Sequence, residues 1–345
     1  MAIDRTQRKE WAREHFWGCE NITLPSFTPD LTELDEEGIR LDVRQGISHG
    51  AFSTLCSIES GLTIEEKKRF VEIVADEAGD GMCVGVALCG DSLEENIELL
   101  QHGERVGASH AMVSYPHNFA PESEEDIYRY NRELLDASDL GIVLFHNDKF
   151  GFHRFHPSGV PFEAFDRLVD LDNAVAMKVS GPDLAMVAEC FDRYGDRVLC
   201  SVPTIVQFPI VMPQYEMQFT GAWTIEAFQT PEQPLVVEMM RLFQQGKAPQ
   251  AMELFGRLGP LFAVVGPRLM TMMPTGIYHW TLFKYFQWLS GGNGGPTRQP
   301  AMRLTAADMR EVRAAYRACG FEVVGDADEE FWAGRAARDR EAAVR

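Results

Sequence analysis

The 345-residue chain has no apolar run that approaches the roughly 20 residues needed to span a bilayer. Its N-terminus, MAIDRTQRKEWAREHFWG, is charged throughout and lacks the apolar core of a signal peptide. The seven cysteines are scattered without a CxxC pair, which argues against a disulfide framework and against a zinc cluster. Basic residues are outnumbered 32 to 52 by acidic ones, and the net charge of −20 repels phosphate backbones and anionic lipids. We therefore expect a cytoplasmic protein that binds no nucleic acid, no membrane and no metal.

A glycine fingerprint for dinucleotides or phosphate loops is also lacking. The composition is that of an ordinary globular protein, 45% hydrophobic and 24% charged. Eight short apolar segments are typical of strands buried on both faces of a parallel sheet. These predicted strands are Asn21–Ser26, Ile47–Cys56, Met82–Cys89, His110–Tyr115, Gly141–His146, Ala174–Val179, Arg197–Pro203 and Met217–Trp223.

Amphipathic helical segments lie between the strands. The first, Thr63–Ala78, opens with the capping-box pattern Thr63-x-x-Glu66. The others are Ser92–Val106, Ser123–Ser138, Pro161–Leu171 and Asp183–Tyr194. This alternation predicts an α/β protein, a (β/α)₈ TIM barrel over residues 21–230.

Helical patterns alone follow the barrel, and they predict a C-terminal helical domain over residues 231–325. Its expected helices are Pro231–Gln245, Ala248–Val265, Thr275–Leu289 and Thr305–Cys319. Residues 1–20 are expected to form an N-terminal helical extension, with a helix at Asp4–Trp17. Residues 326–345 form a charged tail that we expect to fray.

Lys178 is the most informative candidate for chemistry, because it lies inside the apolar strand AVAMKVSG. In a TIM barrel the active site lies at the C-terminal ends of the strands. Burial disfavours an ammonium, lowers its pKa and yields the neutral amine that forms a Schiff base with a carbonyl. The alternative is a lysine whose stem packs on the strand while its ammonium reaches solvent.

Other candidates also follow predicted strands. His146 and Asn147 are placed to relay protons and orient a substrate oxygen, unless a neighbouring loop satisfies the histidine. Cys56 and Ser57 lie in a segment whose hydroxyls and N–H groups hold a carboxylate or simply cap the next helix. Trp223, at the end of the eighth strand, either packs on a bulky substrate or closes the barrel.

Taken in order, these segments resemble the dihydrodipicolinate synthase / N-acetylneuraminate lyase family of Schiff-base aldolases, from about Asn21 to Phe321. Thr23-Leu-Pro-Ser-Phe-Thr-Pro is similar to the family's opening TPF. Ser60-Gly-Leu-Thr-Ile-Glu-Glu resembles its ES…L…E segment. Val175-Ala-Met-Lys178 resembles its GIK, whose lysine forms the imine. The segment from Lys284 through Arg298-Gln-Pro300 to Cys319-Gly-Phe resembles its C-terminal helical domain.

The chain also departs from the family pattern. The family's second strand ends GTTGE, which holds the pyruvate carboxylate, but here Leu55–Glu59 reads LCSIE and only Ser57 keeps a hydroxyl. The proton-relay tyrosine after the fifth strand is matched by His146. Tyr115-Pro-His117 replaces a Tyr-Tyr pair after the fourth strand. Asn147 and Trp223 resemble residues of the hydratase-aldolase subgroup, which releases pyruvate.

The resemblance implies a lyase, of aldolase or hydratase-aldolase type, acting on a 2-oxo acid or related ketone. Lys178 would form the imine, so no separate cofactor is expected, and His146 would shuttle protons. The predicted substrate-binding residues are Ser57, Cys56, Asn147, Tyr115 and Trp223. One alternative is an imine-forming dehydratase or decarboxylase whose substrate lacks the pyruvate carboxylate. Another is a non-catalytic ligand-binding barrel. The resemblance also implies a homodimer or homotetramer.

Overall fold

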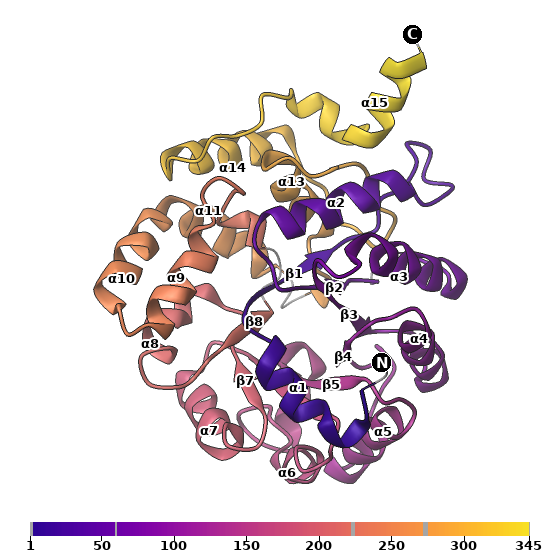
Figure 1. Cartoon of the computed structure of the whole chain (residues 1–345), viewed down its shortest axis with the longest axis vertical. Coiled ribbons are helices and arrows are strands. Elements are labelled where there is room, and N and C mark those ends of the chain that lie inside the picture. The colour runs from indigo at the N-terminus through magenta and orange to yellow at the C-terminus, as the bar shows by residue number, and fades with distance from the viewer. Residues whose placement is uncertain (1–2, 59–60, 222–224, 272–274, 345) are drawn as a thin grey trace.

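Eight parallel strands form a nearly closed barrel, with helices in the connections between them (Figure 1). The computed structural model describes residues 3–58, 61–221, 225–271 and 275–344. The sheet order is β7-β6-β5-β4-β3-β2-β1-β8, and its two end strands contact each other. The strands are β1 (Gly18–Thr23), β2 (Ser53–Cys56), β3 (Cys83–Leu88), β4 (His110–Val113), β5 (Gly141–Asn147), β6 (Ala174–Ser180), β7 (Leu199–Ser201) and β8 (Phe219–Gly221). The predicted TIM barrel is confirmed.

The helices of the barrel begin at the polar caps that the sequence carries. Thr63 and Glu66 form a reciprocal capping box at the start of α3, and Ser123 and Asp126 form one at the start of α5. The barrel helices are α2 (Glu36–Ser48), α3 (Ile64–Ala78), α4 (Leu93–Arg105), α5 (Glu124–Asp136), α6 (Phe162–Leu168), α7 (Leu184–Tyr194) and α8 (Phe208–Val211). Helix α1 (Arg8–His15) precedes the barrel.

Helix α2 corrects the prediction of a long second strand over Ile47–Cys56, because that strand begins only at Ser53. The carboxylate of Asp35 accepts from the N–H of Gly38 at 3.2 Å and caps the helix. Ile39 and Val43, spaced four residues apart, are both buried on its inner face.

Six helices follow the barrel, counted over the described residues. They are α9 (Leu235–Gln244), α10 (Ala248–Arg257), α11 (Gly259–Leu269), α13 (Trp280–Leu289), α14 (Ala306–Ala318) and α15 (Arg335–Val344). The single helix predicted over Ala248–Val265 is two, because α10 ends at Arg257 and α11 begins at Gly259 with a proline in its first turn. No helix in the described part of the chain is long and apolar enough to cross a membrane.

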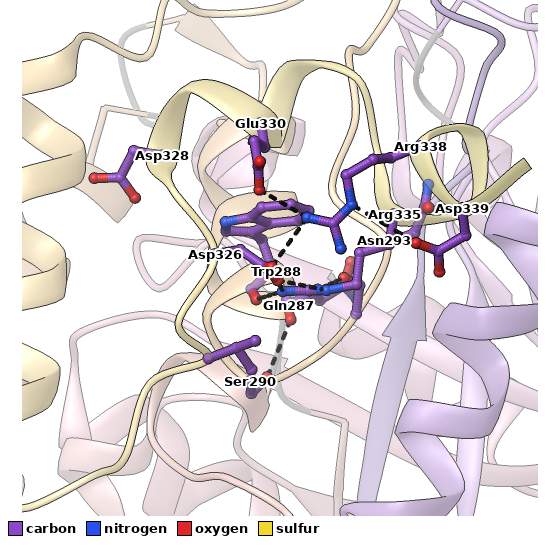
Figure 2. Close-up of polar contacts among 12 residues, drawn as sticks. Gln287, Trp288, Ser290, Asn293, Asp326, Asp328, Glu330, Arg335, Arg338 and Asp339 are labelled. Carbon is purple, nitrogen blue, oxygen red and sulfur yellow. Dashed lines mark hydrogen bonds and ion pairs between the residues drawn. The ribbon is translucent and has the colours of Figure 1, made fainter. Parts of the chain in front are cut away.

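The tail that we expected to fray is docked on the C-terminal helices (Figure 2). Arg335 is buried, donates to the carboxylate of Asp326 at 2.6 Å and stacks over the ring of Trp288 at 4.0 Å. Further along α15, Arg340 makes two 2.8 Å hydrogen bonds to Asp35, the cap of α2. A segment rich in charged residues is typical of a solvated tail, and we predicted one here. The prediction was wrong because these arginines bind carboxylates, and that of Asp35 lies far away in the sequence.

Candidate active site

Lys178 lies within β6 with its side chain in the barrel interior and only 5% of the residue exposed. Its register partners are Phe145 on β5 and Ser201 on β7. The Lys178 Nζ atom is 5.0 Å from the centre of the Phe145 ring and 3.9 Å from the Sδ atom of Met112 on β4. The amine is therefore buried in a largely apolar setting, which is the first of the two alternatives that the sequence left open.

A cavity of about 40 Å³ lies beside this amine, at the carboxyl ends of the strands. The lining is mostly apolar, and none of the described lining residues is acidic. The residues around it are Ile22, Leu55, Ser57, Ala87, Met112, Ser114, Phe145, Lys149, Lys178, Tyr278, Trp280 and Phe283. The polar groups that these lining residues carry are three hydroxyls, the indole N–H of Trp280 and two amines.

The C-terminal helical region contributes one side of the cavity. Trp280 and Phe283 come from the start of α13, and Tyr278 from the segment just before it. The Tyr278 and Trp280 rings lie 4.8 Å apart, and Lys149 Nζ lies 4.7 Å from the centre of the Tyr278 ring. A helix more than 90 residues beyond Lys178 in the chain therefore shapes the site, and this apolar cover strengthens electrostatic interactions inside it.

Ser57 and Cys56 are neighbours in the chain but face opposite sides of the barrel wall. Ser57 lines the cavity with Leu55, and its backbone N–H donates to the carbonyl of Thr23 at 3.0 Å. Cys56 falls between them on β2 and is fully buried away from the cavity. Burial raises the pKa of its thiol, so it is not a thiolate nucleophile.

His146 is buried but does not line the cavity, because successive residues of β5 face opposite sides and Phe145 faces inward. The imidazole lies beneath the loop after β5, where its Nε2 is 3.7 Å from Asp148 Oδ1. Burial, and then the nearby His153, lower the pKa of His146 to about 4. The side chain that faces the lysine is therefore a phenyl ring, which has no proton to relay.

Asn147 and Tyr115, two further predicted binding residues, do not line the cavity. Asn147 Nδ2 donates to Ser180 Oγ at 3.3 Å, and its Oδ1 accepts from the backbone N–H of Lys149 at 2.9 Å. This amide therefore positions the loop that carries Lys149. Tyr115 is buried, its hydroxyl accepting from Asn131 Nδ2 at 2.9 Å. Trp223 lies outside the described residues.

Several cavity residues were missed by the sequence analysis. Met112 and Ser114 alternate with His110 along β4 and its extension, so strand periodicity places them on one face. Phe145 follows from the same rule once Lys178 is taken as its neighbour. Tyr278, Trp280 and Phe283 carry no local signal, because their position depends on how α13 docks. Within the described ranges no group of three or more His, Cys, Asp or Glu side chains could hold a metal ion.

Eight parallel strands in a nearly closed barrel, with helices in the connections between them, define this chain as a TIM-barrel protein. A model of the dihydrodipicolinate synthetase family matches residues 31–277. The chain therefore belongs to this family, whose members include synthases and lyases.

The known relatives agree with this assignment. A 4-hydroxy-tetrahydrodipicolinate synthase of Prosthecochloris aestuarii is 25% identical over 239 residues, covering 67% of this chain and 76% of the relative. The crystal structure of dihydrodipicolinate synthase from Aquifex aeolicus superposes with a TM-score of 0.74 at 18% identity, covering 89% of this chain and 99% of that one. For N-acetylneuraminate lyase from Fusobacterium nucleatum the TM-score is 0.69 at 15% identity, covering 88% and 98%. At these identities the structural likeness shows the shared fold.

Proposed function

We propose that this protein is a class I lyase, of aldolase or hydratase-aldolase type, that forms an imine between Lys178 and a 2-oxo acid or related ketone. The observation that carries the proposal is the position of Lys178, buried at a cavity at the carboxyl ends of the strands. The apolar surroundings disfavour an ammonium and favour the neutral amine as nucleophile.

The reaction follows from the groups around the cavity. The amine adds to the substrate carbonyl to give a carbinolamine, and loss of water leaves a protonated imine. That cation accepts the electron pair of a bond that breaks at the adjacent carbon, so no separate cofactor is required. In an aldol cleavage this is a C–C bond. In a dehydration it is a C–H bond that loses its proton, after which a hydroxyl group leaves with its own electron pair and a proton, as water. Ser57 and Ser114 offer hydroxyls to substrate oxygens, and the rings of Tyr278 and Trp280 pack against the rest of the substrate.

The altered second strand favours a second candidate. Leu55 lines the cavity where the family pattern has a glycine, Cys56 replaces the first threonine of that pattern, and Ser57 is the one hydroxyl that this segment contributes. A site with fewer hydrogen-bond donors holds a carboxylate less tightly. The second candidate is therefore an imine-forming dehydratase or decarboxylase on a ketone without the pyruvate carboxylate.

The test is borohydride trapping with pyruvate and a panel of neutral and acidic ketones, followed by intact mass and peptide mapping. We expect a reduced adduct on the peptide that contains Lys178, and none in Lys178→Ala. Lys284, which is fully buried elsewhere, is the internal control and should stay unmodified. An adduct with neutral ketones alone would select the second candidate. No adduct with any compound would contradict imine chemistry and favour the ligand-binding barrel.

A further inference from the structure

A buried carboxylate lies in the barrel interior below Lys178. Glu20, on β1, is 5% exposed, and its Oε1 atom is 2.6 Å from His110 Nε2 on β4. The same oxygen accepts from Ser53 Oγ on β2 at 3.2 Å. The interior of a TIM barrel is normally filled by branched apolar side chains, so a polar group built from three strands is unusual.

Two glycines leave the space that this group needs. A Cβ atom on Gly85 would lie 2.4 Å from His110 Nε2, so the ring crosses the barrel only because β3 has no side chain there. A Cβ on Gly221 of β8 would lie 2.7 Å from Glu20 Oε2 and 3.6 Å from Lys178 Nζ. The second carboxylate oxygen and the amine therefore converge on the same glycine, with no side chain from β8 between them.

The position of Glu20 near the Lys178 amine bears on the charge that this amine and its imine can carry. A protonated imine in an apolar site is stabilised by a nearby negative charge. Below the lysine, Glu20 supplies such a charge, and His110 and Ser53 fix the Oε1 atom of its carboxylate by hydrogen bonds.

We infer that the Glu20–His110 pair is the counter-charge of Lys178, stabilising the ammonium and then the protonated imine that forms from it. The inference rests on the proposed function for its imine step, whereas the coupling between carboxylate and amine stands without it. Glu20 acts through Lys178 and is a positioning residue.

The other titratable groups near this pair are few among the described residues. Cys56 on β2 and Cys83 on β3 are thiols whose pKa values are raised, chiefly by burial and also by Glu20. Lys149 lines the same cavity as Lys178. Because these neutral thiols contribute no charge, we expect the Glu20 carboxylate, with His110, to determine the electrostatic potential below the Lys178 amine.

The experiment measures the pKa of the Lys178 amine by competitive labelling across a pH series, with mass-spectrometric readout and no ketone present. Glu20→Gln keeps the shape and removes the charge, and we expect it to lower the Lys178 pKa by about one unit or more. Gly221→Ala inserts a methyl group between the two atoms while keeping the charge, and should lower the pKa in the same direction. Glu226→Gln, a buried carboxyl that Asn21 contacts on the other face of β1, is the matched control and should change nothing.

A Lys178 pKa that stays within about 0.3 unit of the wild type in folded Glu20→Gln would overturn the inference. If Glu20→Gln fails to fold by circular dichroism, an unchanged pKa in Gly221→Ala would overturn it instead. Trapping with a ketone is then run on the same variants. A change in the Lys178 pKa without any trapped adduct would support the coupling to Glu20 and contradict the proposed function. A trapped adduct without a change in the Lys178 pKa would support the proposed function and contradict the coupling.

Discussion

Two buried lysines of this protein have opposite surroundings. Lys178 is in a strand beside a cavity, and its Nζ atom lies near the Met112 thioether and the Phe145 ring. Lys284 is in α13 and is fully buried, with its Nζ 2.8 Å from Ser26 Oγ and 3.6 Å from Asp42 Oδ2. Asp42 in turn accepts from the backbone N–H of Asn293 at 2.6 Å.

The difference shows that burial alone does not create a nucleophile. Burial lowers the pKa of Lys284 and raises that of Asp42, but each charge opposes the shift of the other. The paired lysine joins the C-terminal helices to the start of the barrel, where no substrate carbonyl has access. Lys178 has a cavity beside it, so its amine is placed for chemistry.

The largest effect should come from breaking the structural pair. Asp42→Asn leaves the Lys284 ammonium buried without its carboxylate, and we expect the free energy of unfolding to fall by about 3–5 kcal/mol. Chemical denaturation followed by circular dichroism measures this. The double variant Asp42→Asn with Lys284→Met removes the orphaned charge and should recover much of the loss.

A fall of less than about 1 kcal/mol in the single variant would contradict the view that Lys284 is a structural cation. Trapping at Lys178 serves as the control in both variants. Its adduct should persist as long as the protein is folded, because neither substitution is in the cavity.

A smaller effect is expected from placing an additional carboxylate directly beside the Lys178 amine. Met112→Glu places a carboxylate where the Sδ atom now lies 3.9 Å from Nζ. An opposite charge at this range raises an amine pKa by about 1–3 units, so imine formation at neutral pH should slow by about 10- to 1000-fold. The rate of adduct formation under cyanoborohydride measures it.

Met112→Gln is the matched control for that variant, because it has the same size and polarity without the charge. It should leave the trapping rate within a few-fold of the wild type. An equal slowing in both variants would show that packing against the thioether, rather than the charge state of the amine, sets the rate.

The sequence predicted the strand that carries Lys178 correctly, because the segment is apolar apart from this lysine, but it left open whether the amine is buried or reaches solvent. The same strand periodicity places Phe145 on the face of β5 that lines the cavity and His146, one residue further on, on the opposite face, so a proton relay by His146 stays a prediction. Chemical suitability of the imidazole favoured His146, but residue parity along a strand decides which side chain enters a barrel.

The rest of the site depends on contacts between distant parts of the chain. Tyr278, Trp280 and Phe283 reach the cavity through the docking of α13, and α13 is positioned by the Lys284–Asp42 pair. The charged tail was misjudged for the same reason, because Arg340 finds Asp35 at a separation of 305 residues. Composition and periodicity carry no information at that range.

The smallest effect extends the comparison to a third buried base, His146, whose two ring nitrogens have no hydrogen-bond partner within the described residues. Unlike a lysine, an imidazole is neutral near pH 7 without any partner. Its pKa is about 4 in the fold, against about 6.5 in the unfolded chain, so the unfolded state binds the extra proton between these values. The free energy of unfolding should therefore fall as the pH drops from 6.5 towards 4, by about 2 kcal/mol between pH 7 and pH 5.

His146→Gln should remove that part of the pH dependence in urea melts, while the trapping rate at Lys178 stays unchanged. A melt whose pH dependence is the same in both proteins would show that His146 is already charged in the fold, contrary to the depressed pKa.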